Sequence, residues 1–167
     1  WEKLAKKPKL KNYILIYKLN TSNLIFDFAR KLSKLTGRKI VALNLDVVDQ
    51  MKTPDIKGVY SASVEEFLGY IKYADYVVTN SFHGTAFSVI FHKDFYVEAL
   101  QKDFKPNDRV ESLLCLTGLD GCKVKTLEDC RLNVSRDFNF ADDQIRKQYI
   151  KTNQYFERVL NEDGRSF

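Results

Sequence analysis

The first part of the chain alternates short apolar runs with a longer segment of helical periodicity. Residues 13–17 form a nearly continuous apolar run of β-branched and aromatic side chains, which is typical of a strand buried on both faces. Apolar residues then recur at helical spacing up to Gly37, which can close a helix, and Thr21 or Ser22 can cap its start. Residues 39–43 form the next apolar run. Because such crossovers are right-handed, this unit predicts two parallel strands.

The same alternation continues through the middle of the chain. Ser63 and Glu66 have the spacing of a capping box and predict the start of a second helix. A third helix over residues 85–91 is almost wholly apolar, so we expect it to pack deep in the domain. Further strands are expected at residues 59–60, 76–78 and 95–97. Strands that alternate with helices predict a three-layer, Rossmann-like α/β domain with a mainly parallel sheet.

Two more helices are expected in the last third of the chain. The first begins at Asn107 or Asp108 and ends near Gly118, and the second runs from Asp142 with one apolar face. We therefore expect three parts: a Lys-rich linker over residues 1–11, the α/β domain over residues 12–141, and a C-terminal helix over residues 142–167 that packs on or crosses from that domain.

Length, composition and charge narrow the class of protein. A chain of 167 residues with 44% hydrophobic and 29% charged residues fits one globular domain and excludes a disordered protein. Residues 1–11 hold five lysines against one glutamate and so carry most of the net charge of +5. A solvated linker is favoured over a nucleic-acid-binding arm for this segment, because the rest of the chain is nearly neutral.

The cysteines and the apolar runs indicate in which cellular compartment the protein is expected. Three cysteines without metal-ligand spacing predict reduced thiols and no metal site. No apolar run is long enough to cross a bilayer, and the Lys-rich start lacks the apolar core of a secretory signal. We expect a cytoplasmic protein without a membrane span. Because Trp1 replaces an initiator Met, we also expect these residues to come from a longer polypeptide.

The turn after the fourth expected strand is the main candidate for chemistry, because ligands of open α/β sheets bind beyond the carboxyl ends of the strands. Helix N-termini bind anions there, Gly84 would permit close approach, and the Ser81 and Thr85 hydroxyls are potential donors beside Asn80. His83 can exchange a proton near neutral pH. The alternative is structural: the polar residues cap the helix and the histidine satisfies a buried backbone group.

Three basic residues are candidates for binding an anion at the same edge. Arg109 lies at an expected helix N-terminus, where a cation opposes the helix dipole by about 0.3 to 1 kcal/mol unless an anion compensates. An exposed arginine paired with Asp108 or Glu111 is the alternative. Lys102 and Lys105 lie in the preceding polar loop, where they either close over an anion or remain solvated.

Several common catalytic motifs are absent from the sequence. It contains no G-x-G-x-x-G, no G-x-x-x-x-G-K-[ST], no H-E-x-x-H and no G-x-S-x-G. Nicotinamide-dependent, P-loop, zincin and serine-hydrolase functions therefore lack support.

Two segments carry a resemblance to a known family. Residues 73–88, with the order Thr-Asn-Ser-Phe-His-Gly-Thr at 79–85, closely resemble the polysaccharide pyruvyl transferase family. The resemblance continues with Asn-Asp-Arg-Val-Glu-Ser-Leu-Leu at 107–114, and residues 13–17 look like the strand that opens the family's second domain. It spans roughly residues 12–120 and is strongest over 73–91.

The resemblance implies the C-terminal half of a two-domain, GT-B-like enzyme whose active site lies between two Rossmann-like halves. The missing N-terminal domain of the same polypeptide is then a partner. Such enzymes transfer the enolpyruvyl carbons of phosphoenolpyruvate to two hydroxyls of a saccharide, forming a ketal in bacterial exopolysaccharide synthesis. The donor is a substrate, so no cofactor is expected. The acceptor is a saccharide, with a lipid-linked form and a peripheral position at the inner membrane face both left open.

The resemblance also assigns residues. His83 is implied as the acid or base, with Asn80, Ser81, Gly84 and Thr85 around the substrate. The two negative groups of the donor need cations, for which Arg109 matches best and the lysines at 102 and 105 come next. Many relatives carry an arginine two residues before the histidine, where this chain has serine.

Two other functions compete with this one. A GT-B-type glycosyltransferase would bind a nucleotide sugar at the same helix N-terminus, although no glutamate is obviously placed to bind its ribose. A non-catalytic binding module would keep the fold without the reaction. The isolated fragment is expected to fold and to be inactive, because half of the cleft is absent.

Overall fold

A computed structural model of the chain describes residues 1–162 except 21, 99–107 and 133. Thr21, Lys102, Lys105 and Asn107, which the sequence marked as candidates, lie outside the described residues. The strands are β1 (Tyr13–Tyr17), β2 (Lys39–Leu43), β3 (Lys57–Val59), β4 (Tyr76–Thr79), β5 (Asp94–Glu98) and β6 (Lys123–Val124). The α-helices are α1 (Asn23–Thr36), α2 (Val47–Lys52), α3 (Val64–Lys72), α4 (Phe82–Ile90), α5 (Asp108–Thr117) and α6 (Phe138–Glu162).

The six strands form one parallel sheet in the order β3-β2-β1-β4-β5-β6. The predicted three-layer, Rossmann-like class with a parallel sheet is therefore confirmed. In this order the chain progresses outward in one direction from β1 and in the other from β4. The carboxyl ends of β1 and β4 thus meet at the point where the winding reverses, and ligands of such sheets bind at that point.

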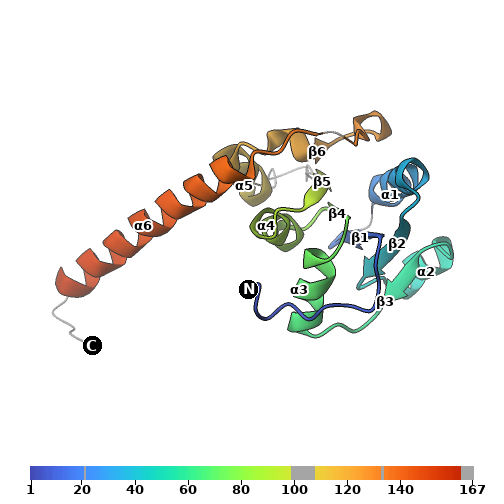
Figure 1. Cartoon of the computed structure of the whole chain (residues 1–167), viewed down its shortest axis with the longest axis horizontal. Coiled ribbons are helices and arrows are strands. Elements are labelled where there is room, and N and C mark those ends of the chain that lie inside the picture. Colours follow the sequence, from blue (N-terminus) through green and yellow to red (C-terminus); the bar gives the residue numbers. More distant parts are fainter. Residues whose placement is uncertain (21, 99–107, 133, 163–167) are drawn as a thin grey trace.

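Helices lie on both sides of the sheet (Figure 1), and an apolar core fills the space between the helices and each face. In β1, Tyr13 and Leu15 belong to the core beneath α3, α4 and α5, whereas Ile14 and Ile16 belong to the core beneath α1. All four are buried. The uninterrupted apolar run of this strand is explained by burial on both faces, as the sequence predicts.

Local capping signals are confirmed at two helices. Ser22 caps α1 by accepting from the Ile25 N–H, and Gly37 closes it with φ of 69°. Ser63 and Glu66 form the expected capping box at the start of α3. These signals fix the positions of the elements that flank the sheet.

Three helices begin where the sequence did not place them. The short helix α2 lies in a segment where the sequence predicts no helix, and Asp46 caps it by accepting from the Asp49 N–H at 2.7 Å. Helix α4 begins at Phe82 rather than residue 85. Helix α6 begins at Phe138 rather than residue 142, because Asp137 accepts from the Phe140 N–H at 2.9 Å and the first turn packs on the core.

Helix α6 extends away from the rest of the domain (Figure 1). Its first turns pack through Phe138, Ala141 and Ile145, whereas Tyr149 and Phe156 farther along are exposed. None of the described helices combines the length and apolar character that crossing a membrane requires. The domain boundaries expected at residues 11 and 141 stay predictions.

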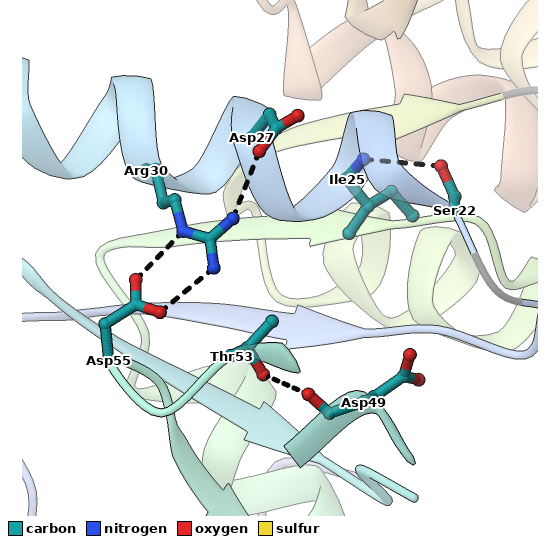
Figure 2. Close-up of polar contacts among 7 residues, drawn as sticks. All are labelled: Ser22, Ile25, Asp27, Arg30, Asp49, Thr53 and Asp55. Atoms are coloured by element: carbon teal, nitrogen blue, oxygen red, sulfur yellow. Dashed lines mark hydrogen bonds and ion pairs between the residues drawn. The ribbon is translucent and has the colours of Figure 1, made fainter. Parts of the chain in front are cut away.

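A buried ion pair connects β1 to α2. The Lys18 ammonium, one residue beyond β1, forms a short ion pair with Oδ2 of Asp49, and both side chains are about 5% exposed. Asp46 is the second carboxylate, at 3.7 Å. Oδ2 of Asp49 accepts no well-aligned hydrogen bond from the described residues. The positive charge of Lys18 therefore compensates the buried carboxylate. Figure 2 shows Asp49 below α1, where its carbonyl accepts from the Thr53 hydroxyl at 2.6 Å.

We expect Asp49→Asn to lower the free energy of unfolding by about 3 kcal/mol or more, because it leaves a buried ammonium poorly compensated. The matched control is Asp27→Asn, also drawn in Figure 2, whose exposed carboxylate pairs with Arg30 at 3.1 Å. That change should cost less than about 1 kcal/mol. Chemical denaturation of both variants measures the difference, and equal losses would contradict a special role for the buried pair.

Candidate active site

The turn that carries the sequence motif lies at the reversal point of the sheet. Strand β4 ends at Thr79 beside Tyr17, the last residue of β1. The Thr79 hydroxyl donates to the Tyr17 carbonyl at 2.5 Å and accepts from the Ser81 N–H at 3.0 Å. A single buried hydroxyl therefore joins the ends of both central strands to the turn.

Asn80 connects the same turn to the loop after β1. Its side-chain oxygen accepts from the Leu19 N–H at 2.9 Å, and its amide nitrogen donates to the Asn20 carbonyl at 3.0 Å. Asn80 is buried, with 2% of the residue exposed. Both ends of the amide are used within the protein, so Asn80 positions the two loops that border the site.

The hydroxyls of Ser81 and Thr85 are also used within the turn. The Ser81 oxygen caps α4 by accepting from the Gly84 N–H at 3.4 Å, and the Thr85 hydroxyl donates to the Ser81 carbonyl at 2.9 Å. Neither residue is exposed to solvent. They hold the first turn of α4, and a direct contact with a substrate stays a prediction for both.

Gly84 is buried at the closest approach of α4 to the sheet. A Cβ atom at this position would lie 2.4 Å from Thr79 Oγ1 and 3.1 Å from Tyr17 Cδ1. Packing between α4 and the ends of β1 and β4 thus already requires glycine here. An approach of a ligand to this backbone, which the sequence suggested, stays a prediction.

His83 is exposed, in contrast to its neighbours in the turn. It lines a pocket of about 260 Å³ together with Tyr17, Asn44 and Phe67. No described residue forms a hydrogen bond with its ring. The alternative that His83 is a buried histidine bonded to a backbone group is therefore wrong. The ring can meet a ligand from the pocket without breaking any contact of the fold.

Arg109 lies next to the motif through Phe82. Its guanidinium carbon is 5.2 Å from the centre of the Phe82 ring, and that ring centre is 5.8 Å from the His83 ring. The arginine and the histidine therefore flank one aromatic side chain. Arg109 is exposed and forms no ion pair with Glu111 or any other described side chain. No carboxylate of the described residues thus balances its charge beside the first turn of α4.

Three pocket residues were not singled out from the sequence. Tyr17 ends β1, Asn44 follows β2 with φ of 53°, and Phe67 comes from α3. The available signal was positional, because the carboxyl ends of parallel strands share one edge of the sheet. The described residues hold no cluster of three or more His, Cys, Asp or Glu side chains placed to bind a metal ion.

The strand order, the two buried cores and the pocket at the reversal point define a Rossmann-like α/β domain of the GT-B-like kind. The chain belongs to the polysaccharide pyruvyl transferase family, whose model matches residues 1–101 and hence more than half of the chain. The match includes the turn with His83 and stops before Arg109. A comparison with curated proteins finds no match.

Two solved structures are similar to this chain in fold. The crystal structure of UDP-GlcNAc 2-epimerase from Methanocaldococcus jannaschii in complex with UDP-GlcNAc and UDP aligns with a TM-score of 0.55 at 14% identity, covering 86% of this chain and 46% of that one. Another structure of the epimerase from the same organism aligns with a TM-score of 0.53 at 9% identity, covering 87% and 46%. The chain thus spans about half the length of these proteins, and at such identities the likeness shows the fold alone.

We expect Gly84→Ala to destabilise the protein by about 1 to 3 kcal/mol, because the added methyl group forces α4 away from Thr79 and Tyr17. Gly121→Ala is the control, since the nearest atom to a Cβ there is Val134 Cγ1 at 3.7 Å. That change should stay within about 0.5 kcal/mol. Thermal unfolding compares the two, and an unaltered Gly84→Ala protein would show that α4 shifts without cost.

Proposed function

We propose that this chain forms one wall of the active site of an enzyme that transfers pyruvate from phosphoenolpyruvate to a saccharide as a ketal. The observation that carries the proposal is His83, an exposed imidazole at the reversal point of the sheet in a chain of the polysaccharide pyruvyl transferase family. The biological setting proposed with it is synthesis of a bacterial surface polysaccharide in the cytoplasm, with a peripheral position at the inner membrane face.

The reaction requires an acid at the donor. Protonation of the methylene carbon of phosphoenolpyruvate makes the adjacent carbon electrophilic, and a first saccharide hydroxyl adds there and loses its proton. A second hydroxyl then displaces phosphate, which gives the cyclic ketal and inorganic phosphate. In this scheme His83 supplies the proton to the methylene carbon, since imidazole exchanges protons near neutral pH.

The donor carries a phosphate and a carboxylate, and both require positive partners. Arg109 is proposed to bind one of them, because its guanidinium lies beside Phe82 at the start of α4 and forms no described ion pair. Lys102 and Lys105 belong to the loop that precedes α5 and stay proposals from the sequence. Asn80, Ser81, Gly84 and Thr85 keep the turn in place, which supports the orientation of the histidine.

The other wall of the cleft is proposed to come from an N-terminal domain of the same polypeptide, because this chain spans 46% of its structural neighbours. The isolated chain would then fold on its own two cores and lack turnover. A nucleotide sugar is the alternative donor, since one neighbour was solved with UDP-GlcNAc and UDP. Binding of phosphoenolpyruvate against UDP-GlcNAc to the complete enzyme separates these proposals, and binding of neither favours a non-catalytic module.

We expect His83→Ala in the complete enzyme to lower turnover by about 10²- to 10⁴-fold, the scale of a positioned acid or base. Thermal stability should change little, because the ring is exposed and unbonded. His92→Ala is the matched control: this histidine lies beyond the other end of α4, where it pairs with Asp142 at 3.0 Å. Phosphate release and unfolding are measured on the same preparations, and unaltered turnover per folded His83→Ala molecule removes the residue from the mechanism.

We expect Arg109→Gln to raise the KM for phosphoenolpyruvate by about 10- to 100-fold, the equivalent of one charge-assisted hydrogen bond. Arg158→Gln is the control, because that arginine also lies over an aromatic ring, Tyr155 at 5.7 Å, but on the projecting part of α6. Steady-state kinetics at varied donor concentration give the two values. Equal KM values for the Arg109→Gln enzyme and its parent would exclude donor binding by Arg109.

A further inference from the structure

A second, larger groove lies beside the edge strand β3, apart from the His83 pocket. Its volume is about 520 Å³, and it is lined by residues 6–10 together with residues of β3, of α3 and of the connector between them. Four lysines line it, Lys6, Lys7, Lys9 and Lys57, together with the carboxylate of Glu66. The groove is therefore lined mainly by positive side chains.

Only part of this charge is balanced within the protein. The Lys6 ammonium bonds Glu66 at 2.8 Å, and this hydrogen bond lowers the pKa of Glu66 and raises that of Lys6. Lys9 and Lys57 form no ion pair with a described residue, and Lys7 lies over the Tyr73 ring at 5.3 Å. Because Lys6 neutralises Glu66 and Lys7 lies over a ring that does not line the groove, Lys9 and Lys57 are the two lysines that remain to attract an anion there.

Residues 6–10, which carry three of the groove lysines, are held against α3. The Lys6 N–H donates to the Glu65 carbonyl at 2.9 Å, and the Lys6 carbonyl packs so closely on α3 that a Cβ at Gly69 would lie 1.7 Å from it. Figure 1 shows the N-terminal segment passing along α3 before it enters β1. The positive side chains thus extend from a backbone that is held in place.

The groove and the His83 pocket are lined by neighbouring residues of the connector between β3 and α3. Ser61 lines the groove, whereas Ala62 and Ser63, the next residues, line the pocket with His83. Since a chain extends at most about 3.3 to 3.6 Å per residue, Ser61 and Ser63 are separated by no more than about 7 Å. A ligand longer than one sugar ring can therefore occupy the pocket and reach the groove across the connector between β3 and α3.

We propose that the basic groove binds an anionic group of the acceptor, a carboxylate on a neighbouring sugar or a phosphate, while the sugar to be modified occupies the His83 pocket. The saccharide nature of this ligand rests on the proposed function, whereas its negative charge follows from the lysines of the groove. Lys9 and Lys57 bind the anion, and Tyr70 offers an aromatic surface in the same groove. The groove selects acidic or phosphate-linked acceptors over neutral ones.

The test measures binding to the complete enzyme by calorimetry, with tetragalacturonate as a carboxylate probe, pyrophosphate as a phosphate probe and maltotetraose as the neutral probe. The double variant Lys9→Gln/Lys57→Gln should weaken binding of at least one anion by about tenfold or more and leave maltotetraose unchanged. Lys3→Gln/Lys11→Gln, which removes two exposed lysines of the same segment that do not line the groove, should bind like the parent.

The two anions distinguish the source of the charge. Lysine-dependent binding of tetragalacturonate indicates an acidic saccharide chain, and lysine-dependent binding of pyrophosphate alone indicates a phosphate-linked acceptor. Binding of neither anion, or anion binding that both double variants retain equally, overturns the proposal. Phosphate release from phosphoenolpyruvate is followed separately. Loss of that reaction with intact, lysine-dependent anion binding refutes the proposed function and leaves the groove assignment standing.

Discussion

The join between the carboxyl ends of β1 and β4 is the constraint on which the site depends. One buried hydroxyl, that of Thr79, donates to the last carbonyl of β1 and accepts from the Ser81 N–H in the turn into α4. Because Gly84 packs directly on this residue, α4 has one position relative to the two strands. The direction in which His83 leaves the helix follows from that position, so a feature of packing determines where the chemistry is available.

Much of the fold was predictable because its signals are local. The apolar run of residues 13–17 implies a strand buried on both faces, and Ser63 with Glu66 implies a helix start, without knowledge of any distant residue. The right-handed crossover rule then makes the sheet parallel. The position of His83 at the carboxyl edge of the sheet follows from the same local signals.

The features that escaped prediction depend on residues far apart in sequence. Helix α2 exposes Val47, Val48 and Met51, so its sequence shows no buried apolar face, and Lys18, one residue beyond β1, holds it through Asp49. The pocket beside His83 likewise draws Tyr17, Asn44 and Phe67 from three elements. A periodicity read along one segment carries no information on such partners. The same holds for the basic groove, whose lysines come from residues 6–9 and from β3.

The charges around the pocket differ between its two helical walls. The first turn of α3 carries Glu65 and Glu66. Their carboxylates accept hydrogen bonds from the backbone N–H and the hydroxyl of Ser63 and so compensate the positive end of that helix.

The first turn of α4 carries no acidic residue. Among the described residues, no carboxylate of its own first turn compensates its positive end, and Arg109 adds a full charge on the far side of Phe82. An anion is therefore favoured at the N-terminus of α4 over the N-terminus of α3. In the proposed reaction, the phosphorylated donor therefore belongs on the α4 side of His83. The α3 side then receives the neutral hydroxyls of the acceptor, with the anionic part of that acceptor continuing past the connector into the basic groove.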